Sequence, residues 1–439
     1  MTRGESAEPL SADDAAILAL EAGPVRGHTC KLILLDGVRG VDDLRHHMAE
    51  RLHRERRLGL RLIDGDTPAW GPDPQLDIDR QVRDGGAVAD ARLAEAVGAL
   101  MAERLPRDRP LWALDVVALE AERTALVWRI HHALADGMTT MRMARNVLFD
   151  DADDDVVGVA PGSATPGDGA GAAPASAARD RAAVETRSRL ASLRPVLHVP
   201  AALRRELARR GAETALDAAI GERRAVAFVG AQLDDVKRIA HALPERATVN
   251  DVVLAAVAGG LRLWLDRLGA HPRALRAKVP VSLHEPGDDE GNRDSFICVD
   301  LPIDESDPVA RLVAIAAETR ERKVDRDADS VDAFFRDLSH VSSSLERFAE
   351  QWAMSPRVFT LNVSNVPGPR GPLSVLGAPV VSMHSLAEIA HRHALRVAVV
   401  SAAGKIGFGF CADADAIGSP QPIADGVAAE LRALSVARG

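Results

Sequence analysis

Seven consecutive residues, His131-His132-Ala133-Leu134-Ala135-Asp136-Gly137, bring two imidazoles, a carboxylate and a glycine together at fixed spacing. A histidine with a pKa of about 6.5 can take a proton from a substrate and return it near neutral pH, so this stretch is a candidate general-base site. Asp136 can fix the turn by pairing with a cation or with backbone amides, and Gly137 permits a positive φ or the close approach of a ligand. The alternative interpretation is a structural turn that buries a satisfied histidine.

The residues on either side predict the elements that hold this stretch. Ala125 to Ile130 are β-prone and place Leu126, Trp128 and Ile130 on one face and Val127 and Arg129 on the other. Beyond Gly137, apolar residues recur at three- and four-residue spacing from Met141 to Leu148, which indicates a helix. The histidine pair should therefore lie at a strand-to-helix corner, where side chains are open to substrates.

Composition narrows the class of protein. The chain has 439 residues, enough for two or more domains, and 46% of them are hydrophobic, as in globular proteins. A net charge of −10 argues against general nucleic-acid binding, and the absence of tyrosine excludes a Tyr acid or nucleophile. Cys30, Cys298 and Cys411 lie far apart, so neither a disulfide framework nor a zinc site is indicated. Without a signal peptide or a run of 18 apolar residues, we expect a cytoplasmic protein.

One break in the pattern divides the chain. Residues from Asp150 to about Ala178 are acidic and then rich in Gly, Ala, Ser and Pro, which is typical of a linker or surface loop. A basic stretch from Arg181 to Arg210 follows, interleaved with leucines and broken by prolines. It is either a solvated connector between domains or a segment that lies on an anionic membrane surface.

The second half again mixes strands and helices. We expect strands over Arg224–Val229, Ser295–Leu301 and Thr360–Val366, and a hairpin from Ala394 to Phe410 that turns at Ala403-Gly404. Helices are expected from Thr248-Val249-Asn250-Asp251 through Leu265, and from Asp425 to Val436.

Several motifs, in this order, carry a resemblance to a known family. The His131 to Gly137 stretch is similar to the active-site motif of the chloramphenicol acetyltransferase-like acyltransferases, which non-ribosomal peptide condensation domains share. Five further stretches resemble the bacterial wax ester synthase/diacylglycerol acyltransferase family: Leu10-Ser11-x-x-Asp14-Ala15, Pro110-Leu111-Trp112, Asn250-Asp251, Pro280-Val281-Ser282-Leu283 with Gly291-Asn292, and Ser364-Asn365-Val366-Pro367-Gly368-Pro369.

This resemblance implies an α/β fold of two chloramphenicol acetyltransferase-like domains with mixed sheets and a tunnel between them. The N-terminal half would span residues 1–149, a flexible linker and basic helical crossover residues 150–222, and the C-terminal half residues 223–439. His132 would lie near the middle of the tunnel.

The resemblance also implies the activity, an O-acyltransferase that moves a long-chain acyl group from acyl-CoA to a fatty alcohol or a diacylglycerol and forms wax ester or triacylglycerol. His132 would be the general base of a ternary complex, with no cofactor and no metal. His131 and Gly137 would shape the site, and Asp136 would pair with an arginine elsewhere. Asn250 would either polarise the reacting centre or cap a helix. Substrate-binding candidates are Pro110, Leu111, Trp112, Ser364 and Asn365, for which core and turn roles are the alternatives.

Two departures from the family pattern concern the pocket: Ser401-Ala402 replaces a Ser-Tyr pair, and Gln81 stands where a histidine is usual. Other motifs favour structural roles. Gly407-Phe408-Gly409-Phe410 lies in an expected strand and not at a dinucleotide-binding turn. His46-His47 and His391-Arg392-His393 are interpreted as surface or packing residues.

Two other functions stay open on the sequence. One is an enzyme of the same fold that uses a carrier-protein substrate. The other is a non-catalytic lipid-coat protein docked through Arg181 to Arg210, against which the intact histidine pair counts. For the acyl-CoA-dependent enzyme, the expected partners are long-chain acyl-CoA and a fatty alcohol or diacylglycerol, with no nucleic acid. Its expected location is the cytoplasm, with possible peripheral contact with membranes or lipid droplets.

Overall fold

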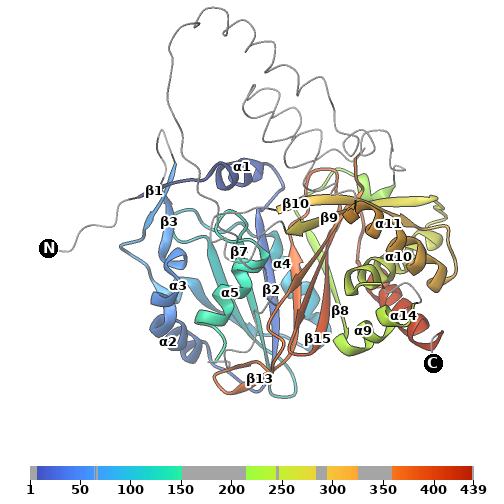
Figure 1. Cartoon of the computed structure of the whole chain (residues 1–439). Helices are drawn as coiled ribbons and strands as arrows, with labels where there is room; N and C mark the ends of the chain where they lie inside the picture. Colours follow the sequence, from blue (N-terminus) through green and yellow to red (C-terminus); the bar gives the residue numbers. More distant parts are fainter. Residues whose placement is uncertain are drawn as a thin grey trace, which may run out of the picture.

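Two six-stranded mixed sheets form the body of the protein (Figure 1). The computed structural model describes residues 7–150 except 64, 66 and 67, and residues 214–243, 247–282, 294–324 and 358–437. The strand orders are β12-β13-β2-β7-β6-β5 in the N-terminal sheet and β10-β9-β11-β14-β15-β8 in the C-terminal sheet. This two-sheet α/β architecture confirms the expected fold class.

The N-terminal half is built on β2 (His28–Asp36), β5 (Val82–Ala87), β6 (Trp112–Ala118) and β7 (Arg123–His131). Its helices are α1 (Ala12–Leu20), α2 (Val41–Arg51), α3 (Ile78–Gln81), α4 (Leu93–Ala102) and α5 (Gly137–Val147). A small sheet of β1 (Glu8–Pro9), β4 (Ala69–Pro72) and β3 (Leu60–Ile63) lies beside α1 (Figure 1). The expected strand before the motif and the helix after it are confirmed as β7 and α5.

The C-terminal half contains β8 (Arg224–Gln232), β9 (Ala274–Ser282), β10 (Asp294–Pro302), β11 (Leu361–Pro367), β14 (Leu395–Ala402) and β15 (Lys405–Asp413). Helices α9 (Leu233–His241), α10 (Val249–Arg267), α11 (Pro308–Val324) and α14 (Gln421–Val436) cover its outer face (Figure 1). The expected hairpin is confirmed by β14 and β15, with Ala403 and Gly404 at positive φ in the turn.

One hairpin of the C-terminal half crosses into the N-terminal sheet. Strands β12 (Ser374–Val375) and β13 (Ala378–Ala387) come late in the chain, yet β13 pairs antiparallel with β2, for example His384 with Leu32. Asp150 fixes this hairpin, because its carboxylate accepts hydrogen bonds from the Leu376 and Gly377 amides at 2.9 and 2.8 Å. Residues 374–387, which the sequence assigns to the C-terminal half, thus complete the other sheet. Sequence order alone does not reveal such an exchange of strands.

The two sheets meet backbone to backbone where β13 crosses β15. A Cβ atom on Gly407 would lie 1.9 Å from the Met383 carbonyl oxygen, and one on Gly409 would lie 2.0 Å from the Ser385 carbonyl oxygen. Phe408 and Phe410, on the opposite face of β15, are buried in the helix-covered core. The alternating glycines therefore permit close packing of the sheets.

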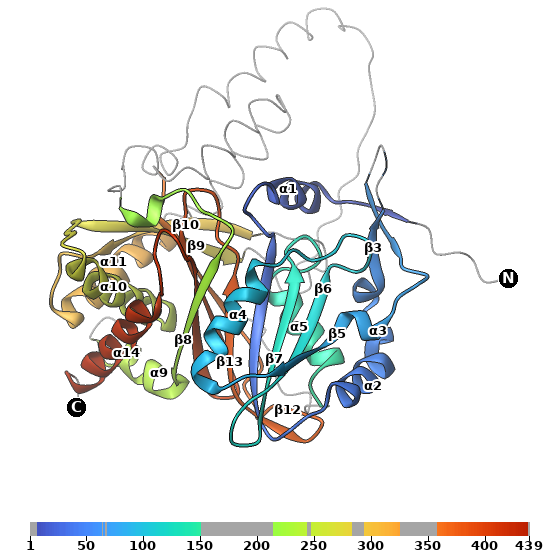
Figure 2. The ribbon, with the colours of Figure 1, turned by 180° about the vertical axis from the view of Figure 1, so that it is seen from behind.

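Helix α4 packs along β8 at the same seam (Figure 2). Gly98 allows this approach, since a Cβ there would lie 2.8 Å from the Arg224 carbonyl oxygen. Most of the predicted linker and crossover, residues 150–222, lies outside the described residues, as does the basic stretch from Arg181 to Arg210. Within the described ranges, no helix is long and apolar enough to cross a membrane.

Candidate active site

His131, the last residue of β7, is enclosed on every side. Its side chain is 1% exposed, and its Nδ1 accepts a hydrogen bond from the Ala133 amide at 3.1 Å. The Leu111 carbonyl oxygen accepts a hydrogen bond from its amide at 2.9 Å, so the Pro110-Leu111-Trp112 stretch holds the end of the strand. The burial and contacts of His131 are compatible with the site-shaping role that the resemblance implies, which stays a prediction.

His132 begins the turn and is only half-buried. Its amide donates to the Gly27 carbonyl oxygen at 2.9 Å, and its Nδ1 is buried without a hydrogen-bond partner among the described residues. Burial and the charge of Arg396 lower the pKa of His132 to about 4, although the Asp136 carboxylate acts in the opposite direction. A neutral imidazole at physiological pH is the form that a general base requires.

Asp136 and Gly137 set the start of α5. The Asp136 carboxylate accepts a hydrogen bond from the Thr139 amide at 2.6 Å and caps the helix. No arginine of the described ranges pairs with it, and the nearby cation is instead Lys31. Burial lowers the pKa of Lys31 to about 8, although the Asp136 charge acts in the opposite direction. Gly137 faces Val366 of β11, where a Cβ would lie 2.7 Å from Val366 Cγ2. The motif thus packs directly against the C-terminal half.

Strand β11 places the side chains of the two substrate-binding candidates Ser364 and Asn365 on opposite faces of the C-terminal sheet. Alternate residues of a strand point to opposite faces. Val363 and Val399, the residue opposite Asn365, belong to the helix-covered core, whereas Val366 packs toward the N-terminal half. Ser364 therefore shares the face that meets the His132 motif, and Asn365 lies on the other face. The sequence cannot separate adjacent residues in this way before the register of the strand is known.

A polar row that the sequence analysis missed crosses the same face of the C-terminal sheet. Lys278, Asn362 and Arg396 are register neighbours on β9, β11 and β14. Burial lowers the pKa of Lys278 to about 8 and also lowers that of Arg396. A second buried lysine, Lys31 on β2, donates from Nζ to Ser385 Oγ at 2.7 Å. A charged residue inside an apolar strand pattern is the sequence signal that could have identified Lys278, Arg396 and Lys31. Asn362 carries no such signal.

The Pro110-Leu111-Trp112 stretch lies in the core of the N-terminal half. Leu111 and Trp112 are each 1% exposed, and Trp112 Nε1 donates to the Leu58 carbonyl oxygen at 2.8 Å. Gln81, which departs from the family pattern, donates from Nε2 to the Pro110 carbonyl oxygen at 3.0 Å. These contacts favour the core role that the sequence left open.

Asn250 lies in the first turn of α10, near its start. Thr248 is the N-cap, and Thr248 and Asp251 form a reciprocal capping box, so Asn250 is not the cap. Its side chain is half-buried, and no hydrogen bond joins it to another described residue. The polarising role implied by the resemblance stays a prediction.

Other candidates have structural environments. His47 Nε2 lies 2.8 Å from the Leu148 carbonyl oxygen, while His46 is exposed beside Glu50. His393 is buried and stacks on Phe359 with ring centroids 4.3 Å apart. The sequences Gly291-Asn292 and the end of Pro280-Val281-Ser282-Leu283 lie outside the described residues.

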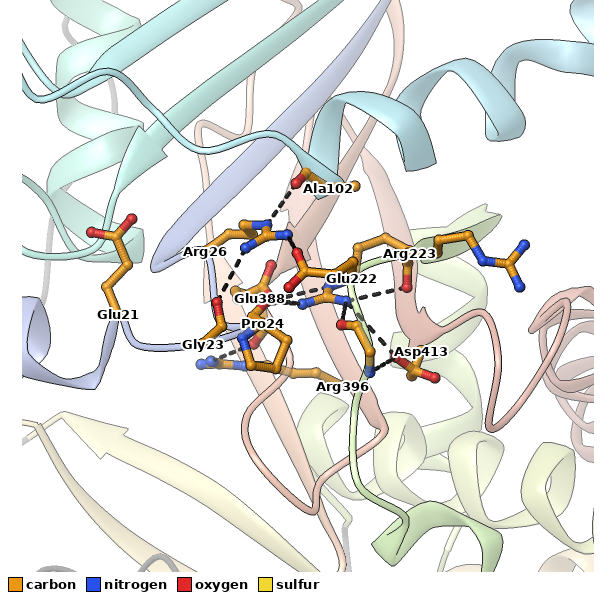
Figure 3. A network of polar contacts seen from close by, with 12 residues as sticks. Glu21, Gly23, Pro24, Arg26, Ala102, Glu222, Arg223, Glu388, Arg396 and Asp413 are labelled. Atoms are coloured by element: carbon orange, nitrogen blue, oxygen red, sulfur yellow. Dashed lines mark hydrogen bonds and ion pairs between the residues drawn. The ribbon is translucent and has the colours of Figure 1, made fainter.

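A buried ion network closes the seam between the halves (Figure 3). Arg224 donates from Nη2 to Glu388 Oε1 at 2.7 Å and to the Pro24 carbonyl oxygen at 2.6 Å. Arg26 pairs with Glu222 beside them. Burial raises the pKa of Glu388 to about 7, even though Arg224 favours its ionised form. Segments from both halves therefore share one network.

The family comparisons account for this arrangement. The wax ester synthase/diacylglycerol acyltransferase catalytic domain matches residues 10–253, and the C-terminal domain of the same family matches residues 290–435. The chain belongs to the wax ester synthase/diacylglycerol acyltransferase family. The resemblance in its motifs is thereby confirmed.

Relatives from Mycobacterium tuberculosis H37Rv agree. The protein named "Putative diacyglycerol O-acyltransferase Rv0221" is 29% identical over 468 residues, which cover 98% of this chain and 96% of the relative. The protein named "Putative diacyglycerol O-acyltransferase Rv3087" is 30% identical over 448 residues, covering 93% and 92%.

Solved structures support the same fold. The wax ester synthase/diacylglycerol acyltransferase from Marinobacter aquaeolei VT8 is 25% identical with a TM-score of 0.71, and the alignment covers 98% of this chain and all (100%) of that one. The first condensation domain of the CDA synthetase has a TM-score of 0.55 at 15% identity, over 100% and 98% of the two chains. The second likeness shows the shared fold alone.

Proposed function

We propose that this member of the family transfers a long-chain acyl group from acyl-CoA to a fatty alcohol or a diacylglycerol. The product is a wax ester or a triacylglycerol. Family membership and the names of the relatives support the reaction class. The observation that supports the mechanism is the difference between the two histidines. His131 is enclosed, whereas His132 is half-buried and has a pKa of about 4.

In the proposed mechanism both substrates bind together in the space between the halves, in keeping with the expected tunnel. Neutral His132 takes the proton of the acceptor hydroxyl as its oxygen attacks the thioester carbonyl carbon. The tetrahedral intermediate then collapses, the carbon–sulfur bond breaks, and the imidazolium returns the proton to the CoA thiolate. The hydroxyl attacks directly, so no acyl-enzyme forms.

The first test is acceptor-dependent release of CoA thiol from palmitoyl-CoA by the purified protein. Hexadecanol and dipalmitoylglycerol serve as alternative acceptors, and the lipid products are separated by chromatography. An ester product that requires the acceptor supports the proposal, and the preferred acceptor identifies the substrate class. If the folded protein releases no thiol with either acceptor, the acyl-CoA reaction is excluded. Transfer only from an acyl carrier protein would then favour the carrier-dependent enzyme, and vesicle binding without transfer would favour the lipid-coat protein.

Replacing the proposed base should abolish transfer without unfolding the protein. We expect His132→Ala to lower kcat by about 10²- to 10⁴-fold, the usual contribution of general-base catalysis. The matched control is His46→Ala, which removes an exposed histidine beside Glu50 and should leave kcat unchanged. Circular dichroism checks the fold of both variants. A His132→Ala enzyme that keeps most of its turnover would contradict the mechanism.

A further inference from the structure

Glu21 is a buried carboxylate beside the active-site motif that the mechanism has not used. It is the C-cap residue of α1, its side chain is 4% exposed, and its Oε2 lies 3.5 Å from His131 Nε2. Although 110 positions separate the two residues in the sequence, they meet inside the N-terminal half. A carboxylate that faces one ring nitrogen of a histidine can fix the orientation and tautomer of that ring.

The other contacts of His131 select the tautomer. Its Nδ1 accepts a hydrogen bond from the Ala133 amide, so the proton of the neutral ring lies on Nε2, the atom that faces Glu21. Gly27 closes the remaining side, because a Cβ there would lie 2.5 Å from Nε2, and its φ of +71° suits glycine. The imidazole is thus confined between Gly27, Ala133 and Glu21.

Glu21 is itself held in place. Arg104 Nη1 donates to Oε1 at 2.8 Å, and Arg107 Nη2 donates to Oε2 at 2.7 Å. Burial alone would raise the pKa of Glu21. The contacts of its carboxylate with His131 and Arg107 have the larger combined effect, and the pKa is lowered to about 2. The carboxylate is therefore ionised at every pH at which the enzyme would work.

The helix that precedes Glu21 is anchored by the N-terminal motif Leu10-Ser11-x-x-Asp14-Ala15. Ser11 Oγ caps α1 by accepting from the Asp14 amide at 3.0 Å. The Asp14 carboxylate accepts from Arg57 Nη2 at 3.1 Å and from Trp70 Nε1 at 3.0 Å. The Leu10-Ser11-x-x-Asp14-Ala15 stretch thus fixes α1, and α1 delivers Glu21 to His131.

We propose that Glu21 is a positioning residue for the transfer reaction, acting on His132 through His131. The proposal rests on the proposed role of His132 as the base. Glu21 and Gly27 belong to the connection between α1 and β2, and the Gly27 carbonyl oxygen holds the His132 amide. With the His131 ring fixed by Glu21, both the turn and this connection keep the His132 imidazole in its reactive orientation.

The kinetic test replaces the charge and keeps the shape. We expect Glu21→Gln to lower kcat by about tenfold to hundredfold, as for other groups that orient a working histidine, with KM changed less than about twofold. Glu21→Asp, which keeps the charge on a shorter side chain, should recover part of the loss. The matched control is Glu103→Gln, which removes a carboxylate that pairs with Arg129 and Arg83 and does not contact His131. Equal losses in Glu21→Gln and Glu103→Gln would overturn the proposal.

A double-mutant cycle tests whether the effect passes through His131. In a His131→Gln background, adding Glu21→Gln should cost less than about twofold in kcat, because the contact is already gone. If the two losses multiply instead, Glu21 does not act through His131.

A spectroscopic readout separates this proposal from the proposed function. In protein with ¹⁵N-labelled histidine, the His131 Nε2 resonance, assigned through His131→Gln, should move and broaden in Glu21→Gln and stay unchanged in Glu103→Gln. An unmoved resonance would overturn the positioning role. If the wild-type protein transfers no acyl group, the proposed function fails, and this resonance still reports whether Glu21 fixes the His131 ring.

Discussion

The adjacent histidines His131 and His132 lie in different environments because a strand ends between them. His131 is the last residue of β7 and is buried, with its amide donating to the Leu111 carbonyl oxygen and its Nδ1 accepting from the Ala133 amide. His132 is the first residue after the strand. The alternation of side chains in the sheet therefore does not fix the direction of its ring, which is half-buried. At the scale of single residues, the proposed chemistry depends on which of the two imidazoles is partly open: His132 is half-buried, whereas the side chain of His131 is 1% exposed.

The low pKa of His132 predicts how activity responds to acid. At pH 6.0 a histidine with a pKa of about 6.5 is only about one quarter neutral, whereas one with a pKa of about 4 is almost entirely neutral. We therefore expect kcat/KM to stay nearly constant from pH 7.5 to 6.0. The measurement is a pH–rate profile with palmitoyl-CoA and the preferred acceptor, with circular dichroism at each pH. A loss of about three quarters of the activity at pH 6.0 would contradict a neutral His132.

Glu388, whose pKa lies near 7, titrates within the same range, so a Glu388→Gln enzyme is the control for that group. The stability of the fold should respond in the direction set by His132. Between pH 6.5 and 4 the unfolded chain binds a proton at this residue that the folded chain does not. The contribution of His132 to the unfolding free energy is therefore complete above pH 6.5 and is lost as the pH falls toward 4.

At the scale of elements, the motif places a helix start against a strand of the other half. Asp136 caps α5, and Gly137 lets that helix approach Val366 on β11. The two residues that end the motif are thus the residues that join two elements. A substitution at either residue should therefore affect both the proposed site and the packing of α5 against β11.

Removing the cap should lower stability and activity together. We expect Asp136→Ala to reduce the unfolding free energy by about 1 kcal/mol and to lower kcat, because the first turn of α5 loses the acceptor for the Thr139 amide. Asp136→Ser keeps a capping oxygen and should restore most of the stability. Urea denaturation and the transfer assay measure both quantities. A fully stable Asp136→Ala protein would show that the cap is not needed.

Local patterns predicted the elements well and the contacts between them poorly. The strand ending at His131, the helix after Gly137 and the turn at Ala403-Gly404 follow from side-chain period and turn chemistry. The contact between Glu21 and His131, by contrast, depends on how α1 packs, and no local period contains that information. Lys31 is a charge in an apolar strand that the sequence analysis did not use, and only the tertiary structure shows that it reaches Ser385.

At the scale of the whole molecule, the close approach of β13 and β15 holds the two sheets together. We expect Gly409→Ala to destabilise the protein by about 2 kcal/mol, since its Cβ would meet the Ser385 carbonyl oxygen at 2.0 Å and both partners are backbone. The matched control is Gly230→Ala on the neighbouring strand β8, where the nearest atom to the new Cβ lies at 3.5 Å. Urea midpoints compare the two variants. Equal stability of both would contradict close sheet packing at Gly409.

The exchange of β13 also governs when the protein can finish folding on the ribosome. Lys31 on β2 and Ser385 on β13 are 354 residues apart, so at about 5 to 20 residues per second roughly 20 to 70 s of translation separate them. Throughout that interval the edge of β2 that β13 will cover is an unpaired strand edge, which can pair with other nascent chains. The enzyme that we propose for lipid synthesis is therefore most exposed to aggregation before β13 has been made.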